Sequence, residues 1–262
     1  DSTFITINGY NMLIDSGNDS DGYYISQFLK SQNITKIDSF IITHFDEDHM
    51  GGAYKLLEEI SVGTLYTPSG NAETQTYKKF KNTIKEKNIN VNSNLIVSNQ
   101  IAYPIGNANW KVLNINGETP NDSSIVIELN YNTTKYLFMG DASEKIENQL
   151  ECTDIDVLKV SHHGSKTATS QEFLNKITLK YAIISVGENN SYGLPSQEVL
   201  NRLLNNNVET YRTDKNGTIW ITSDGNLINI KTLEYNLDGS GRKQASIFQR
   251  KYYLLSFYNF TT

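Results

Sequence analysis

Three apolar segments of this chain each run directly into a short group of histidine or acidic residues. The segments and the groups that follow them are 37–43 with HFDEDH at 44–49, 135–139 with Gly140-Asp141, and 155–160 with SHHGS at 161–165. Short apolar runs bounded by turn signals are typical of buried strands. All four histidines of the chain fall in these groups. Imidazoles and carboxylates on loops that cap buried strands are what a divalent cation site requires.

Composition narrows the class of protein. A chain of 262 residues can form one large domain or two small ones. Because its net charge is −6, the chain lacks the positive field expected of a general duplex-DNA binder. A nucleic-acid substrate is still compatible with this charge, because a bound metal would supply positive charge locally. Cys152 is the only cysteine, which excludes an internal disulfide and a thiolate zinc cluster. No stretch has the length of a membrane span and no signal peptide opens the chain, so we expect a soluble protein, cytoplasmic or extracytoplasmic, without membrane insertion.

Local patterns predict strands alternating with helices. Asn8-Gly9 between two apolar runs indicates a hairpin. Helical spacing predicts a helix over 22–31 with Asp21 as its N-cap, and a second helix over 50–60 that is entered through Gly51-Gly52. A β-rich half followed by β–α alternation favours sheets covered by helices, a layered α/β body.

The first group predicts most of a metal site by itself. In an extended loop the side chains of His44, Asp46 and Asp48 project the same way, so an imidazole and two carboxylates can converge. His49 opens the following helix and can turn toward a neighbouring point. Carboxylates crowded this closely would repel one another without a cation among them.

The other two groups complete this hypothesis. Two cations about 3.5–4 Å apart could share the ligands, with Asp141 bridging them and His162 completing a shell. Such a pair would polarise a substrate oxygen and supply a metal-bound hydroxide as nucleophile. We expect Asp48 and His163 to act in catalysis, although either ring of the His162-His163 pair can be the ligand while its neighbour contacts backbone or substrate.

Several other residues can be interpreted either as structural or as part of a binding site. We expect Asp15 to accept hydrogen bonds from the first group's loop, with direct metal binding as the alternative. Lys159 could contact phosphate, but a solvated lysine is the expectation. Tyr192, Tyr211 and Trp220 could stack on bases; we expect core or sheet-surface positions instead.

These motifs together resemble the metallo-β-lactamase superfamily. The order His-x-Asp-x-Asp-His-x-Gly-Gly, Gly-Asp and Leu-Lys-Val-x-His-His-Gly-Ser is most similar to the C-terminal domain of the competence protein ComEC and its soluble relatives. The resemblance implies an α/β fold, a four-layered αββα sandwich with the site at the sheet edges. It predicts a hydrolase domain over 1–232 and leaves 233–262 as a C-terminal extension: added structure, a partner-binding segment or an artificially appended sequence.

The resemblance also assigns ligands and reveals departures. The residues on ligand positions are His44, Asp46, Asp48, His49, Asp141 and His162. Asp46 stands where many members have a histidine, which makes Mn²⁺ a rival to Zn²⁺. The histidine that many members carry before the Gly-Asp is absent, and Asn121 or a neighbouring serine occupies that region. Leu194 stands where ComEC-like domains have the histidine of Tyr-Gly-His-Pro.

Three functions follow as hypotheses. The first is a binuclear metallohydrolase with two Zn²⁺ or Mn²⁺ ions that cleaves phosphodiesters, as a nuclease of single-stranded DNA or on another phosphodiester substrate. The second is a hydrolase of another ester, lactone or amide at the same site. The third is a catalytically weak, metal-bound module that binds nucleic acid or a protein, a hypothesis motivated by Leu194.

Overall fold

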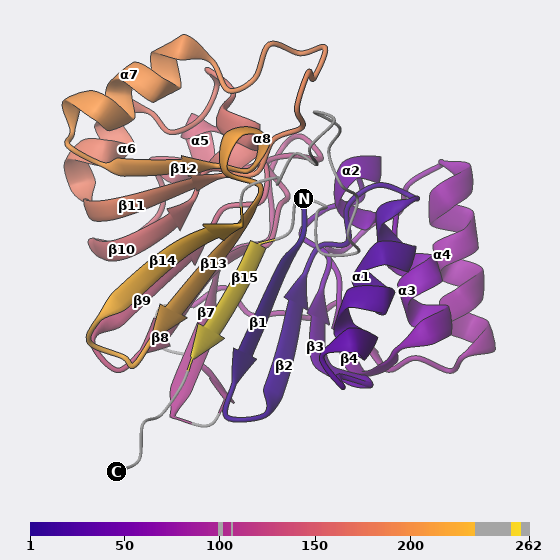
Figure 1. Cartoon of the computed structure of the whole chain (residues 1–262). Helices are drawn as coiled ribbons and strands as arrows, with labels where there is room; N and C mark the ends of the chain where they lie inside the picture. The colour runs from indigo at the N-terminus through magenta and orange to yellow at the C-terminus, as the bar shows by residue number, and fades with distance from the viewer. Residues whose placement is uncertain (99–101, 106, 234–252, 258–262) are drawn as a thin grey trace, which may run out of the picture.

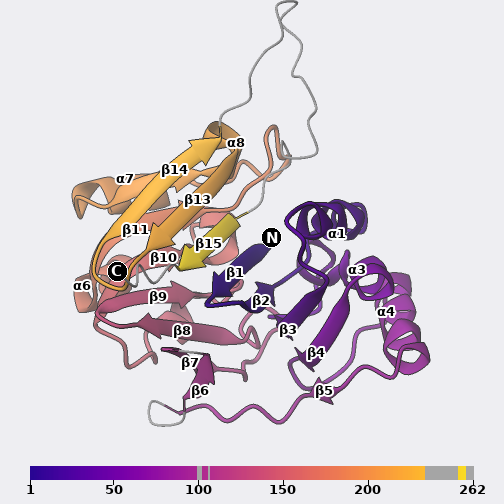
Figure 2. The ribbon, with the colours of Figure 1, turned by 60° about the horizontal axis from the view of Figure 1, so that its bottom comes forward.

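The computed structural model describes residues 1–98, 102–105, 107–233 and 253–257, and it has four layers. Two β-sheets face each other, and helices cover the outer face of each (Figures 1 and 2). The first sheet has the order β14 (Ile228–Leu233), β13 (Thr218–Ser223), β15 (Tyr253–Phe257), β1 (Thr3–Ile7), β2 (Tyr10–Ile14), β3 (Lys36–Ile41), β4 (Ser61–Tyr66) and β5 (Val91–Asn92). The second has the order β12 (Glu209–Arg212), β11 (Thr178–Ile184), β10 (Asp154–Lys159), β9 (Thr134–Phe138), β8 (Val126–Tyr131), β7 (Ala108–Asn114) and β6 (Tyr103–Ile105). The predicted αββα sandwich is confirmed.

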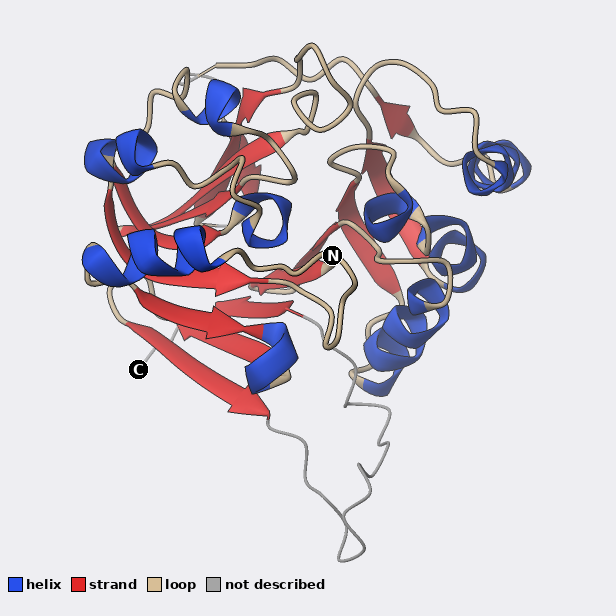
Figure 3. Ribbon diagram, turned by 90° about the horizontal axis from the view of Figure 1, so that it is seen from above, coloured by secondary structure: helices blue, strands red, loops and turns tan. Residues whose placement is uncertain are grey.

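The helices fall into two groups, one on each outer face (Figure 3). The first sheet carries α1 (Asp21–Ser31), α2 (Glu47–Met50), α3 (Ala53–Glu59) and α4 (Gln75–Glu86) on its side of the molecule. The second carries α5 (Glu144–Glu147), α6 (Gln171–Lys176), α7 (Gln197–Asn205) and α8 (Thr213–Asn216), and a short 3₁₀ turn, Ser161–Gly164, follows β10. Parallel strands with intervening helices require this outer covering, because both faces of such a sheet must be buried.

Three apolar layers hold the sandwich together. Ile5, Trp110 and Ile127 are fully or almost fully buried between the two sheets. The outer layers contain residues such as Phe40 with Leu56 under α1, α3 and α4, and Leu158 with Phe173 and Val199 under α5 to α7. Burial of each large apolar side chain contributes roughly 1.5–3 kcal/mol, so the sheets form a rigid base for the loops at their edges.

Two details of the helices differ from the sequence prediction. Asp21 does not cap α1: it is the first helical residue, and its carboxylate accepts from the backbone N–H of Asn18 at 2.9 Å. The predicted helix over 50–60 is broken into α2 and α3 at Gly51-Gly52. At the break the backbone N–H of Gly52 donates to the carbonyl oxygen of Gly17 at 3.1 Å and not to the preceding helical turn, and a Cβ on Gly52 would lie 2.4 Å from the carbonyl oxygen of Ser16.

The C-terminal part of the chain contributes β15, which lies between β13 and β1 and is parallel to both. The remainder of the predicted extension, residues 234–252 and 258–262, lies outside the described residues. Among the helices that the structure describes, none has the length and apolar character needed to cross a membrane.

Candidate metal centre

The predicted site residues meet because their strands end at the same edge of the two sheets. β2 and β3 are parallel and lead to Asp15 and His44, while β9 and β10 are parallel and lead to Asp141 and His162. β1 is antiparallel to β2, so its first residues lie at this edge as well. The carboxyl edge of the parallel strands therefore gathers side chains that are far apart in the sequence.

His49 is fixed by Asp15, as expected from the sequence. Asp15 accepts from His49 Nδ1 at 2.8 Å and from the backbone N–H and the hydroxyl of Thr43, each at 2.8 Å. With Nδ1 as the donor, Nε2 of His49 is directed into the site. A carboxylate behind a histidine fixes the tautomer in this way in metal sites. Burial opposes a charge on His49, but Asp141 and Asp15 outweigh it and raise its pKa to about 9.

Asp141 lies between the two histidines of the first group. Its Oδ1 is 3.1 Å from His49 Nε2, and its Oδ2 is 3.9 Å from His44 Nε2. The two imidazole rings are 4.2 Å apart between centroids. Gly140 precedes Asp141 with a φ of +53°, and Ser124 Oγ accepts from the Asp141 backbone N–H at 3.1 Å. Oδ1 of Asp141 thus faces His49, while Oδ2 faces His44 and also lies 3.7 Å from Nε2 of His163.

The double histidine occupies a tight turn in which both residues have a positive φ. This conformation is uncommon for non-glycine residues and is characteristic of functional sites. His163 donates from Nδ1 to the carbonyl oxygen of Ser185 at 2.8 Å, and its Nε2 lies 2.9 Å from Asp48 Oδ2. His162 is more exposed, and its Nε2 lies 3.9 Å from Asp141 Oδ2. Both rings reach the site, with His163 as the more deeply placed of the two.

Asp1 is a member of the cluster that the sequence did not predict. Ligand atoms of Asp1, His49, Asp141 and His163 lie within 4.8 Å of one another. The Asp1 carboxylate is also 2.6 Å from the ammonium of Lys159. Lys159 is buried at 4% exposure, so the expectation of a solvated lysine was wrong. The ion pair is buried because Lys159 is the last residue of β10, directly beneath the site.

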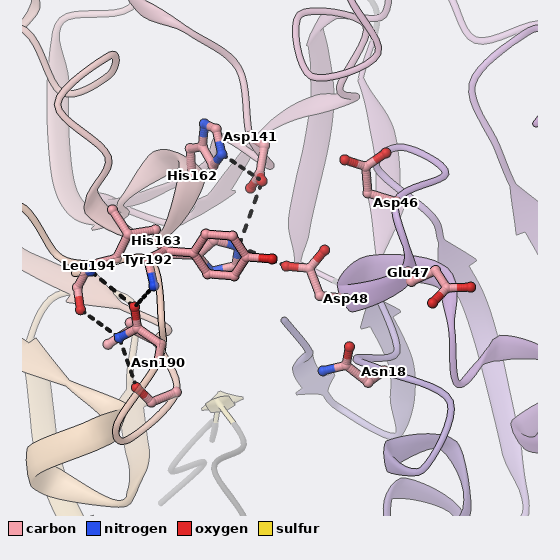
Figure 4. Close-up of a pocket in the computed structure, with 12 residues that line it drawn as sticks. Asn18, Asp46, Glu47, Asp48, Asp141, His162, His163, Asn190, Tyr192 and Leu194 are labelled. Carbon is pink, nitrogen blue, oxygen red and sulfur yellow. Dashed lines mark hydrogen bonds and ion pairs between the residues drawn. The ribbon is translucent and has the colours of Figure 1, made fainter.

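The remaining acids line an open pocket above the buried cluster. Asp46 Oδ2 is 3.7 Å from His44 Nε2, and Asp48 reaches His163 from α2. The pocket has a volume of about 510 Å³ and is shown in Figure 4. Its lining residues are Asn18, Asp46, Glu47, Asp48, Asp141, His162, His163, Val186, Gly187, Asn190, Tyr192 and Leu194. None of them is a lysine or arginine.

The donor set fits a divalent cation site. Three buried atoms of predicted ligands, Nε2 of His44, Nε2 of His49 and Oδ1 of Asp141, make no hydrogen bond of acceptable geometry within the described part of the chain, although the last two lie 3.1 Å apart. Buried polar atoms without partners are costly, and a cation would satisfy all three. Burial disfavours the charge of Asp141, but His49 outweighs it and lowers the pKa of this carboxyl. Nitrogen and oxygen donors of this kind suit Zn²⁺ or Mn²⁺.

Two departures from the family pattern have visible consequences here. Ser124, not Asn121, lies beside His44, with its hydroxyl oxygen 3.5 Å from Nδ1. Leu194 lies in the pocket wall and packs partly against the apolar layer outside the second sheet. Tyr211 and Trp220 pack against the apolar layers, as expected. The same expectation was wrong for Tyr192, which is 84% exposed in a loop at the pocket.

Comparison with known proteins agrees with this geometry. The sequence model of the metallo-beta-lactamase superfamily matches residues 1–188. The chain belongs to the metallo-β-lactamase superfamily. Among solved structures, the metallo-beta-lactamase fold protein YhfI from Bacillus subtilis has a TM-score of 0.52 at 9% identity, over 79% of this chain and 85% of that one. A variant of the β-hydroxylase CmlA also has a TM-score of 0.52, at 12% identity, over 88% of this chain and 52% of its own.

Similar sequences include a ComE operon protein and a recombination protein. ComE operon protein 3 of Bacillus subtilis is 33% identical over 199 residues, which are 73% of this chain and 25% of that protein. Recombination protein 2 of Haemophilus influenzae is 30% identical over 212 residues, 77% of this chain and 25% of its own length. The chain therefore spans about a quarter of the length of these relatives.

A buried glutamate holds the segment that leads from the histidine turn into α6. Glu147 of α5 accepts from the backbone N–H groups of Thr169 and Ser170, at 2.5 and 3.0 Å, just beyond the 161–165 group. Burial raises the pKa of Glu147, because its backbone donors offset only part of the desolvation.

The raised pKa of Glu147 predicts a pH-dependent stability term. Its contribution is fully present below the unfolded-state pKa of about 4.5 and is lost as the pH rises through the higher folded-state pKa. We expect the stability of the wild type relative to Glu147→Gln, measured by urea unfolding, to decrease between pH 4.5 and pH 8. A difference that stays constant over this range would contradict the prediction.

Proposed function

We propose that this chain is a metal-dependent hydrolase that uses two divalent cations to cleave phosphodiesters, with single-stranded DNA as its substrate. The observation that carries the proposal is the position of Asp141, whose two oxygens face His44 and His49 separately. We assign His44 and Asp46 to one cation, Asp48, His49 and His162 to the other, and Asp141 to both. Paired cations would polarise a phosphoryl oxygen and acidify a water molecule.

Side chains around the cations would orient the substrate and donate hydrogen bonds to it. The bond from His163 Nδ1 to the Ser185 carbonyl directs Nε2 toward the pocket and toward Asp48 Oδ2, 2.9 Å away. When protonated, this ring would donate from Nε2 to a phosphoryl oxygen that replaces Asp48 as its acceptor, and the nearby Asp48 carboxylate would stabilise its charge. Burial opposes ionisation of Asp48, but the hydrogen bond from His163 outweighs it and lowers the pKa of Asp48. Asp48 would therefore be ionised at neutral pH.

The charge of the pocket supports a substrate bound through cations. Its lining includes four acids, Asp46, Glu47, Asp48 and Asp141, and no lysine or arginine. A phosphodiester would be repelled by these acids unless cations screened them. The competence and recombination relatives support DNA as the source of the phosphodiester.

The test is cleavage of labelled single-stranded DNA by protein loaded with Mn²⁺ or Zn²⁺, with Asp48→Ala assayed alongside. We expect cleavage that a chelator abolishes and that the variant loses. Because the pocket lacks fixed cationic side chains, the chelator is also expected to abolish DNA binding, measured by fluorescence anisotropy. If the loaded protein leaves all phosphodiesters intact but hydrolyses a lactone or amide, the substrate assignment is wrong.

Leu194 predicts a specific weakness in this activity. The loop side of the pocket consists of Val186, Gly187, Asn190, Tyr192 and Leu194, so it has no side chain that readily protonates a leaving alkoxide. A general acid contributes about 10²–10⁴-fold where leaving-group protonation limits the rate. We expect Leu194→His to raise kcat on DNA by about tenfold and to leave kcat on bis(p-nitrophenyl) phosphate, which has a good leaving group, unchanged. An equal increase on both substrates would contradict this explanation.

A further inference from the structure

Tyr192 is a large aromatic side chain whose position packing does not explain. It lies in the loop between β11 and α7, where it is 84% exposed yet lines the pocket. In Figure 4 its ring is directed from this loop across the pocket, toward the side on which Asp48 lies. An exposed aromatic ring contributes little to folding, because its apolar area stays in water.

The loop that carries Tyr192 is held in one shape. The side-chain amide of Asn190 donates to the carbonyl oxygens of Gly187 at 3.1 Å and Leu194 at 2.7 Å. Its oxygen accepts from the backbone N–H groups of Tyr192 at 3.2 Å and Leu194 at 3.0 Å. Four hydrogen bonds from one side chain therefore brace the turn on both sides of the ring.

The same loop is tied to the histidine turn. The backbone N–H of Ser196 donates to the carbonyl oxygen of Gly164 at 2.9 Å, and a Cβ on Gly164 would lie 2.5 Å from Cβ of Pro195. The backbone that carries Tyr192 is thus held at a fixed place relative to the histidine turn. A group placed in advance loses little conformational entropy on binding.

The two walls of the pocket are suited to bind two different kinds of chemical group. The wall with Asp46, Asp48 and Asp141 takes cations and, through them, an anion, whereas the wall with Val186, Tyr192 and Leu194 offers apolar atoms and an aromatic face. A nucleotide combines both, a phosphodiester next to a flat base. Only an unpaired base exposes its face to such a ring, and aromatic platforms of this kind bind single strands.

We propose that Tyr192 stacks on the base of a nucleotide adjacent to the scissile phosphodiester, and so selects single-stranded over duplex DNA. This inference rests on the proposed function and names how that site recognises its substrate. Stacking on one aromatic residue is worth a factor of roughly 5 to 150 per base. Every base has a face that can stack, so the preference is for strandedness and not for sequence.

The experiment combines a protein variant with a substrate lacking one base. Loaded wild type, Tyr192→Ala and Tyr192→Phe are assayed on single-stranded oligonucleotides in which one abasic position is moved along the strand. We expect Tyr192→Ala to raise KM about tenfold on the intact strand, and Tyr192→Phe to keep the wild-type KM. When the abasic position lies at one particular place near the cut, the KM values of wild type and Tyr192→Ala should become equal. Tyr23→Ala is the matched control, because Tyr23 is 53% exposed on α1 and does not line the pocket.

A second measurement separates this inference from hydrolysis itself. The same variants are titrated by fluorescence anisotropy against a phosphorothioate strand, which resists cleavage, in the presence of Mn²⁺. Coupling here means that Tyr192→Ala weakens binding of the intact strand but not of a strand with one particular abasic position. Such coupling supports stacking even if no strand is cleaved. In that case only the proposed hydrolysis fails. Cleavage without such coupling, equal losses on intact and abasic strands, or no binding at all would overturn the stacking proposal.

Discussion

Replacing Asp141 with asparagine is expected to lower kcat/KM of the metal-loaded protein by about 10³-fold. In the two-cation site proposed above, Asp141 would supply charge to both cations, and its loss would remove several kcal/mol of electrostatic stabilisation. The side chain is 3% exposed, and its oxygens lie 3.1 Å from His49 Nε2 and 3.9 Å from His44 Nε2, whereas the carboxylates of Asp1 and Asp48 come no nearer than 3.8 Å to His49 Nε2. Bound metal per chain, measured by elemental analysis after dialysis, should fall from two ions to one or none.

The control for Asp141→Asn is Glu47→Gln. Glu47 lines the same pocket, and its substitution by glutamine removes the same charge as Asp141→Asn. Its carboxylate accepts from the Thr76 hydroxyl at 2.7 Å, and Glu47 occupies no predicted ligand position. We expect this variant to retain two ions and to change kcat/KM by less than about threefold, as for an exposed charge in water. Equal losses in both variants would mean that Asp141 acts only through the overall charge of the pocket.

The positions of most site residues could be predicted because strands constrain where their ends lie. The apolar runs before His44, Asp141 and His162 became β3, β9 and β10, and parallel pairing within each sheet brought each run's last residues to one edge. The sequence alone could not tell which of the two imidazoles, His162 or His163, is the metal ligand and which has another role. Their arrangement depends on two successive residues with positive φ, a conformation that no local pattern announces.

The residues that were missed depend on tertiary contacts. Asp1 reaches the cluster only because β1 pairs antiparallel with β2, and a lone aspartate before a strand carries no motif. Lys159 looks like a surface lysine in sequence, but Asp1 compensates its charge inside the protein. Tyr192 lies in an irregular loop, where neither helical nor strand periodicity indicates which side chains are buried. In each case the deciding contact lies far away in the chain or outside regular structure.

Asp15→Ala is expected to destabilise the protein by at least about 4 kcal/mol and to weaken cation binding about 10–100-fold. The substitution leaves the buried N–H and hydroxyl of Thr43 and Nδ1 of His49 without their acceptor, and each buried unsatisfied donor costs about 1–3 kcal/mol. Asp15 also has a φ of +59°, which costs alanine roughly 1 kcal/mol more. The loss of affinity follows because His49 no longer has a fixed tautomer or ring orientation.

Asp15→Asn separates the two effects of Asp15. Asparagine tolerates a positive φ and keeps one acceptor, so it should recover most of the stability in a urea titration. It lacks the negative charge that favours donation from His49 Nδ1, and so it should recover less of the cation affinity in a calorimetric titration with Mn²⁺ or Zn²⁺. If both variants bind cations as tightly as the wild type, Asp15 is only a structural residue. Such a result would place the cations away from His49, because a ligand histidine cannot lose the group that orients it without a change in affinity.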